Sequence, residues 1–134
     1  MRCQISIEYI SIVFGFLLLM TPLWVYIYSY SNSLNYQVAI NYAQDLVDSV
    51  KDAAEFVYSQ GEPATIPLRV HVPPYVQSIN SSNGIISVYL NLPSGVSEIF
   101  SETNVNVSLS IPYSQGEYVL RVRAQEGYVN VSLY

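Results

Sequence analysis

The chain has 134 residues, of which 51% are hydrophobic and only 11% are charged, with a formal net charge of −5. Ordinary soluble domains are roughly 25% charged, so this balance indicates burial in a membrane or an assembly and argues against a free soluble enzyme. The five cations are scattered along the chain, so they form no basic stripe for nucleic acid. The single cysteine, Cys3, excludes an intrachain disulfide or a multi-thiolate zinc site.

An uncharged apolar segment begins near the N-terminus. Residues 9–44 contain no charged side chain, and Ile10–Tyr28 is almost wholly apolar. Its nineteen residues, at ~1.5 Å each, match the roughly 30 Å hydrocarbon core of a bilayer. Amphipathic rings, which favour the membrane interface, gather at its end: Trp24, Tyr26, Tyr28 and Tyr30. The segment predicts a transmembrane helix.

Two further features refine this helix. Arg2 precedes the apolar run and the next cation is Lys51, which predicts a cytoplasmic N-terminus and places residues after about 30 outside the cell. Pro22 lies within the run, where it removes a hydrogen bond and clashes with the carbonyl of Leu18. A kink or a locally unwound turn is therefore expected at Pro22.

Helical periodicity continues beyond the apolar segment. Apolar residues recur at spacings of three and four, as in an a/d seam: Tyr36, Ala39, Ala43, Leu46, Val50, Ala53 and Val57. Asp45, Asp48, Asp52 and Glu55 recur on nearly the opposite face, as a solvated face or, alternatively, a calcium site. Gly61 and Pro63 end the pattern, so we expect one helix from about Ile5 to Tyr58.

The sequence of residues 61–134 predicts short strands separated by turns. Runs of strand type occur at Thr65–Val72, Ile85–Leu90, Asn104–Ile111, Tyr118–Ala124 and Tyr128–Leu133. Asn83-Gly84, Gln115-Gly116 and Glu126-Gly127 are turn dipeptides. The sequence therefore predicts an α+β chain, in which a long N-terminal helix precedes a small antiparallel β-sheet or β-sandwich domain.

The first nine residues carry the most informative motif. Gln4, Ser6, Glu8 and Tyr9 directly precede the apolar run, and here the chain resembles archaeal type IV pilin-like proteins with a class III signal peptide. Their motif is Gln-x-Ser-x-Glu followed by Tyr or Phe. Cys3 stands where that family typically has Gly.

The resemblance implies four parts. Residues 1–3 would be a leader removed by a prepilin peptidase, 4–30 the transmembrane and filament-core half of the helix, 31–60 its amphipathic extension, and 61–134 an extracellular β-domain. The chain would begin as a membrane-anchored precursor and become a structural subunit of a surface filament, built by pilus assembly machinery and serving roles such as adhesion. Its main partner would be itself.

Glu8 stands out on physical grounds as well. A charge at mid-bilayer costs ~2.5–3.5 kcal/mol on insertion scales, so such a group needs a partner. The new amine of Gln4, in the same or a neighbouring chain, is the expected partner in an assembled filament. The alternative is that Glu8 reaches the cytoplasmic headgroups.

The sequence is also compatible with other hypotheses for the apolar run and for the role of the chain. The apolar run could be a secretory signal cut near Ser29-Tyr30-Ser31, but it exceeds the usual 7–15 residues. The chain could be a minor or priming subunit, or a membrane-anchored extracellular binding domain that never polymerises and keeps residues 1–3.

The outer region offers modification sites and no catalytic constellation. Asn80, Asn106 and Asn130 begin Asn-x-Ser sequons, which are candidates for N-glycosylation. His71 stands alone in a strand-like run and is read as a sheet residue. No grouping typical of catalysis is present, so we expect no enzyme activity, cofactor or metal site. Arg121 and Arg123 share one strand face, where they are solvated or pair with Glu98 or Glu102.

Overall fold

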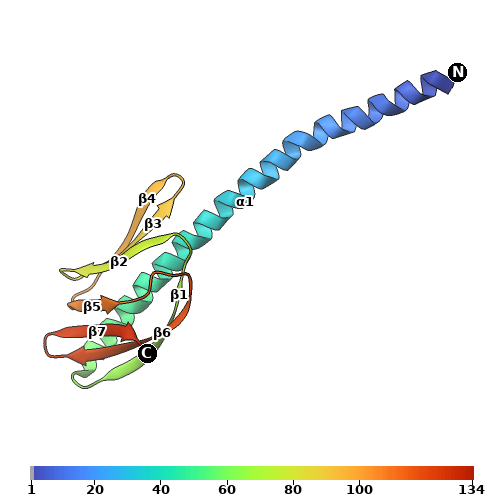
Figure 1. The fold of residues 1–134 in the computed structure, drawn as a ribbon. Helices are drawn as coiled ribbons and strands as arrows, with labels where there is room; N and C mark the ends of the chain where they lie inside the picture. The colour runs from blue at the N-terminus through green and yellow to red at the C-terminus, as the bar shows by residue number, and fades with distance from the viewer. Residues whose placement is uncertain (1) are drawn as a thin grey trace. The chain divides into compact units, whose positions relative to one another are not determined.

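The computed structural model describes the backbone of residues 2–134 and the side chains from Ser6 onward. One helix, α1 (Arg2–Gln60), is followed by seven strands in this part of the chain (Figure 1). This order confirms the predicted α+β class. Contacts divide the chain into two compact units, which we call the helical unit, ending at Tyr36, and the β-unit, Gln37–Tyr134.

Pro22 does not interrupt α1. The helix is continuous on both sides of this residue, so the unwound turn that the sequence allowed does not form. The neighbouring hydroxyl is also satisfied within the helix, because Thr21 Oγ1 donates to the carbonyl oxygen of Leu17 at 2.9 Å. Ser11 bonds the carbonyl of Ile7 in the same way, also at 2.9 Å. These hydroxyls therefore expose little unmet polarity on an apolar helix.

The predicted seam forms the buried face of the second half of α1. Tyr36 is half-buried, and the other seam residues are buried, together with Val47 and Ala54: Ala39, Ala43, Leu46, Val50, Ala53 and Val57. Because Gln37–Gln60 belongs to the β-unit, the amphipathic extension shares a core with the strands. The seam therefore packs against this chain's own β-structure.

The strands form two sheets. Their bounds are β1 Thr65–Val72, β2 Val76–Ser82, β3 Ile85–Leu92, β4 Gly95–Glu102, β5 Val107–Ser110, β6 Gly116–Gln125 and β7 Tyr128–Leu133. Sheet A has the order β1-β6-β7-β5, and sheet B has the order β2-β3-β4. Figure 1 shows both sheets beside the C-terminal half of α1. The β-unit is thus a helix layer covered by strands.

Two features of the sheets differ from the prediction. The run Asn104–Ile111 was expected in an antiparallel sheet, but β5 pairs with β7 in parallel. This strand starts only at Val107, since the backbone N–H of Val105 donates to Thr103 Oγ1 at 3.3 Å rather than to a sheet ladder. In addition, β2 and β4 were not predicted. Each buries a single apolar side chain, Ile79 or Ile99, so neither has the alternation that marks a strand.

The strand alternation predicted for the Tyr118 run is confirmed. Leu120, Val122 and Ala124 of β6 are buried, whereas Arg121 and Arg123 between them are exposed. Adjacent β7 buries Val129 and Val131, which pair with Ala124 and Val122. One face of sheet A therefore belongs to the core and the other faces outward.

The turn between β2 and β3 is tightly defined. Asn83 and Gly84 both have positive φ, 52° and 75°, as a two-residue type I′ hairpin turn requires. A Cβ at Gly84 would lie 2.6 Å from the carbonyl oxygen of Thr103. In turn, the Thr103 N–H donates to the Gly84 carbonyl at 2.7 Å. The predicted Asn-Gly turn is confirmed, and it also joins β2 and β3 to the end of β4.

Candidate functional site

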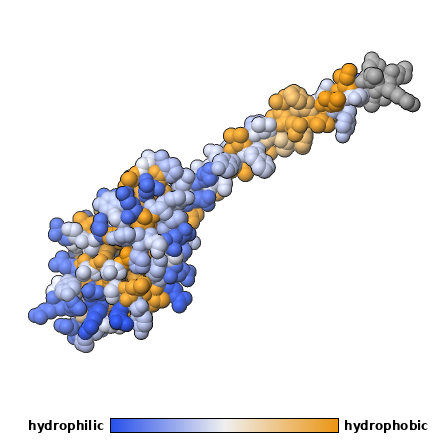
Figure 2. Space-filling view, viewed as in Figure 1, coloured by the Kyte–Doolittle hydropathy of each residue, from blue (hydrophilic) through white to orange (hydrophobic). Residues whose placement is uncertain are grey.

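The helical unit presents an apolar surface that nothing in the described chain covers. Leu19 is 72% exposed and Trp24 is 78% exposed. The helix is long and apolar enough to cross a membrane, and none of its most apolar 18-residue window is buried. Figure 2 shows this apolar surface along the N-terminal half of α1. Such a surface needs an apolar environment, which a bilayer or neighbouring helices would supply.

One face of this helix is shaped for contact with another helix. Two shallow apolar hollows follow each other and meet at Leu17, the first lined by Tyr9, Ile10, Val13 and Phe14 and the second by Met20, Thr21, Trp24 and Val25. Within them, one set repeats at spacings of three and four: Ile10, Val13, Leu17, Met20 and Trp24. This is the spacing at which side chains of one helix enter the gaps of another.

Two tyrosine rings stack on each other near the end of the apolar segment. The rings of Tyr26 and Tyr30 stack, with centroids 6.2 Å apart and planes within 10°. They are four residues apart, so they lie one above the other on one side of the helix. Tyr28 is also exposed. The structure thus groups tyrosines at the end of the apolar segment, and their placement at a membrane interface stays a prediction.

The residues of the predicted processing motif lie on the first turns of α1. Ser6, Glu8 and Tyr9 are exposed helical residues. The side chains of Cys3 and Gln4 fall outside the described residues, as does Met1 of the predicted leader. Cleavage before Gln4 and an ion pair with its amine therefore stay predictions.

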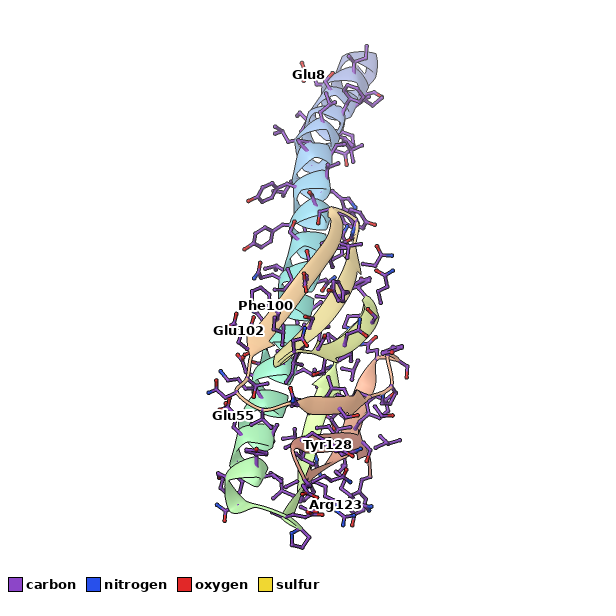
Figure 3. All side chains as sticks on the ribbon, turned by 90° about the vertical axis from the view of Figure 1, so that its left-hand side faces the viewer. Glu8, Glu55, Phe100, Glu102, Arg123 and Tyr128 are labelled. Atoms are coloured by element: carbon purple, nitrogen blue, oxygen red, sulfur yellow. The ribbon has the colours of Figure 1, made fainter. Side chains whose placement is uncertain are left out.

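Glu8 is the one charged side chain between Ser6 and Gln44. Figure 3 shows it on the outside of α1. No hydrogen bond or ion pair joins it to any other side chain from Ser6 onward. A carboxylate beside the apolar hollow that begins at Tyr9 is available for a partner from outside the described chain.

The three sequons differ in accessibility. Asn80 on β2 and Asn106 just before β5 are exposed. Asn130 is half-buried in β7, between β5 and β6 of sheet A. Asn80 also lines an open groove between β2 and β5, together with Ser108 and Tyr113. On accessibility, Asn80 and Asn106 are better candidates for modification than Asn130.

His71 and the acidic residues of α1 form no metal-binding grouping among the described residues. His71 lies in β1, as expected, and its ring is 4.7 Å from that of Tyr42 on α1. From Ser6 onward, no three His, Cys, Asp or Glu side chains are grouped to hold a metal ion. The acids of α1 lie along an exposed helix face rather than around a common point.

The phenol of Tyr89 has a raised pKa and a hydrogen-bond partner on the neighbouring strand. Its hydroxyl donates to Glu98 Oε1 at 2.8 Å across the β3–β4 pair. This hydrogen bond, followed by partial desolvation and the negative charge of Glu98, raises the pKa of Tyr89 above its ordinary 10.0. The pair lies on an exposed surface, so we assign it a structural role in sheet B.

Sequence reasoning missed the apolar surface of β4. Val96 and Phe100 are exposed on this edge strand, and the strand itself was not predicted.

Comparison of the chain with protein-family models, curated proteins and solved structures gave no match.

Proposed function

We propose that this chain is a structural subunit of an archaeal type IV pilus-like surface filament. The observation that carries the proposal is the contrast within one continuous helix: its first half exposes apolar side chains throughout, and its second half closes the core of a β-unit. A subunit of this kind resides in the bilayer first. It then exchanges lipid for the helices of neighbouring subunits, while the β-units coat the outside.

The residues have distinct roles in this mechanism. Prepilin peptidase cleaves before Gln4 and creates a new amine. The hollows along Ile10, Leu17 and Met20 receive side chains of a neighbouring helix, so van der Waals packing replaces lipid contact. Glu8 pairs with the Gln4 amine of a neighbour, which offsets the cost of holding two charges in an apolar filament core. The subunit performs no catalysis.

Processing is tested by mass spectrometry of the protein from native archaeal membranes and from sheared filaments. The mature chain should begin at Gln4, with formal charge −6, because removing Arg2 from a chain of charge −5 takes away one cation. An intact N-terminus together with absence of filaments would instead support a monomeric anchored domain. A start near Asn32 would support the secretory alternative. A processed chain that is rare in filaments would mark a minor subunit.

Assembly is tested at Glu8. Removing one partner of a buried ion pair typically costs ~3–5 kcal/mol, so Glu8→Gln should shorten or abolish filaments. This change nearly conserves size, and it should leave the fold of the β-unit intact. Leader removal must be measured in the variant, since Glu8 also belongs to the peptidase motif. Normal filaments built from processed Glu8→Gln subunits would contradict the charge-docking role.

Glycosylation belongs to the same proposal, because the sequons all lie in the β-unit. Asn80 and Asn106 should carry added mass in protein from the native host, and Asn130 less often. Unmodified peptides at all three positions would dismiss glycosylation and leave the filament assignment untouched.

A further inference from the structure

The β-unit carries opposite charges on two outward faces. On α1, Asp45, Asp48, Asp52 and Glu55 form a line that we call the acidic stripe; the three aspartates are exposed and Glu55 is half-buried. Asp48 and Asp52 each lie two residues from buried Val50, or ~200° around the helix, so they face away from the core. The stripe is therefore the outer surface of the helix layer.

The second face is on sheet A. Arg121 and Arg123 are exposed on β6, between side chains that point into the core. The guanidinium of Arg121 lies 4.6 Å from the ring centroid of Tyr134, which holds this cation against an aromatic surface. Tyr128, at the start of β7, is also exposed. We call Arg121, Arg123, Tyr128 and Tyr134 the arginine face.

The two faces point in different directions and lack ionic partners. Figure 3 shows Glu55 on the helix side of the β-unit and Arg123 with Tyr128 on the other side. From Ser6 onward, no carboxylate lies within 4.0 Å of the Arg121 or Arg123 guanidinium. Glu98 and Glu102, which the sequence offered as partners, lie on β4 of sheet B instead. Both charged faces are thus left for another molecule.

Their spacings match. Alternate residues of a strand are ~6.6 Å apart, so Arg121 and Arg123 present two cations at this interval. Residues four apart on a helix rise ~6 Å and share a side, so Asp48 and Asp52 present two carboxylates at nearly the same interval. Arginine also binds carboxylates through two parallel hydrogen bonds. Each arginine of one molecule can therefore meet one carboxylate of another.

We propose that the arginine face of one β-unit docks on the acidic stripe of a second copy of this chain. This inference rests on the proposed filament function and deepens it by naming the outer contact between subunits. Because the two surfaces are different and lie on different sides of the unit, the contact is head-to-tail. Every docked copy then offers a free stripe or a free arginine face to the next, so the contact propagates along an open assembly.

A second copy fits better than another anionic partner. A polysaccharide or nucleic acid would need only the arginine face, and it would leave the acidic stripe without a role. Two arginines are also few for phosphate-backbone binding, which usually depends on many cations. The matched stripe is present on every copy and is presented at the same concentration as the arginines.

The inference is tested with charge reversals in the full chain, expressed in an archaeal host that lacks the endogenous copy. Arg121→Glu with Arg123→Glu should reduce filament number by about ten-fold or more, because like charges then face each other across the contact. Asp48→Lys with Asp52→Lys should have the same effect. All four substitutions in one chain should restore filaments, since each reversed side chain then meets an opposite charge across the contact.

A matched control separates a specific contact from net charge. Glu98→Lys and Glu102→Lys on β4 of sheet B, added to the two arginine reversals, give the same net charge as the four-fold exchange but leave the stripe acidic. This variant should remain deficient. Membrane level, processing at Gln4 and circular dichroism of each variant establish that the subunit is made, cleaved and folded.

The outcomes are distinct. If the unaltered chain forms no filaments, the proposed function fails. If it forms filaments and folded, processed reversal variants do so equally well, only the docking contact is wrong. If the arginine reversals matter and the aspartate reversals do not, the arginine face binds a different anionic partner and the second-copy proposal is overturned. Rescue by the control variant would likewise overturn it.

Discussion

The two units of this chain use the same kinds of residues for different ends. In the helical unit, apolar side chains surround α1 and remain exposed; in the β-unit, the seam residues of α1 from Ala39 to Val57 lie on one face and are buried. Leu19 is 72% exposed, whereas Leu46 is 2% exposed on the same helix. The distribution of apolar residues around a helix thus distinguishes a segment that needs an external apolar environment from one that completes its own domain.

Truncation of the chain tests whether the second half of α1 is needed for the β-unit to fold. A fragment spanning Gln37–Tyr134 keeps the seam with the strands and should be soluble and fold cooperatively. A fragment that begins at Gly61 loses the helix layer and exposes the apolar inner face of the strands, so it should aggregate or remain unfolded. Circular dichroism and thermal unfolding measure the difference. Equal folding of both fragments would show that the helix is dispensable for the core.

Leu46 and Leu19 allow the same substitution to be made in each unit of one helix. Leu46→Ala removes a buried side chain and should lower the free energy of unfolding of the β-unit by ~2–5 kcal/mol. Leu19→Ala is the matched control in the exposed segment and should leave that free energy unchanged. Chemical denaturation of the detergent-solubilised chain, followed through the β-structure, measures both. A similar loss for the two variants would contradict the division into units.

The sequence predicted the helix more fully than the sheets. Spacings of three and four in Ala39–Val57 are strong signals because the residues at these spacings all meet the same core. By contrast, β2 and β4 are edge strands of sheet B with one buried side chain each, so their pattern is mostly polar. The parallel partner of β5 was also beyond the sequence, because pairing direction depends on how the chain crosses between sheets.

The candidate sites also differ in how far they could be predicted from the sequence. The exposed apolar helix and the isolated Glu8 were predicted from the sequence, because composition alone reveals them. The arginine face could be suspected from the alternation in β6, but its lack of a carboxylate partner depends on the fold. Only tertiary structure places Glu98 and Glu102 on another sheet.

Gly84 and Gly127 are both needed for their backbone conformation, but only Gly84 is also needed for lack of space. Gly84 and Gly127 both have positive φ, 75° and 82°. A Cβ at Gly84 would clash with the Thr103 carbonyl, whereas one at Gly127 meets nothing within 4 Å. Gly127→Ala should therefore lower the free energy of unfolding only by the backbone strain, ~1–2 kcal/mol. Gly84→Ala should lower it by clearly more, because the steric clash adds to the strain. Thermal unfolding of the two variants decides this, and equal losses would show that the loop at Thr103 yields to the new methyl group.

The smallest expected effect concerns the Tyr89–Glu98 pair on sheet B. The hydrogen bond favours the neutral phenol, so the pKa of Tyr89 in the folded chain lies above the ordinary value of 10.0. A raised pKa means that the folded state holds this proton more tightly than the unfolded state does. The resulting stabilisation is fully present below pH 10.0 and is lost as the pH rises through the folded pKa.

Substitution of the acceptor tests this assignment. Glu98→Gln removes the negative charge and should bring the titration of Tyr89 back toward its ordinary range. Carbon-13 labelling of the tyrosine Cζ atoms allows the titration to be followed by NMR, and Tyr89→Phe identifies the signal among 13 tyrosines. Because the pair is exposed, stability at neutral pH should change little in either variant. Identical Tyr89 titrations with and without the Glu98 carboxylate would show that this cross-strand bond does not persist in solution, although both strands would still be held by their backbone ladder.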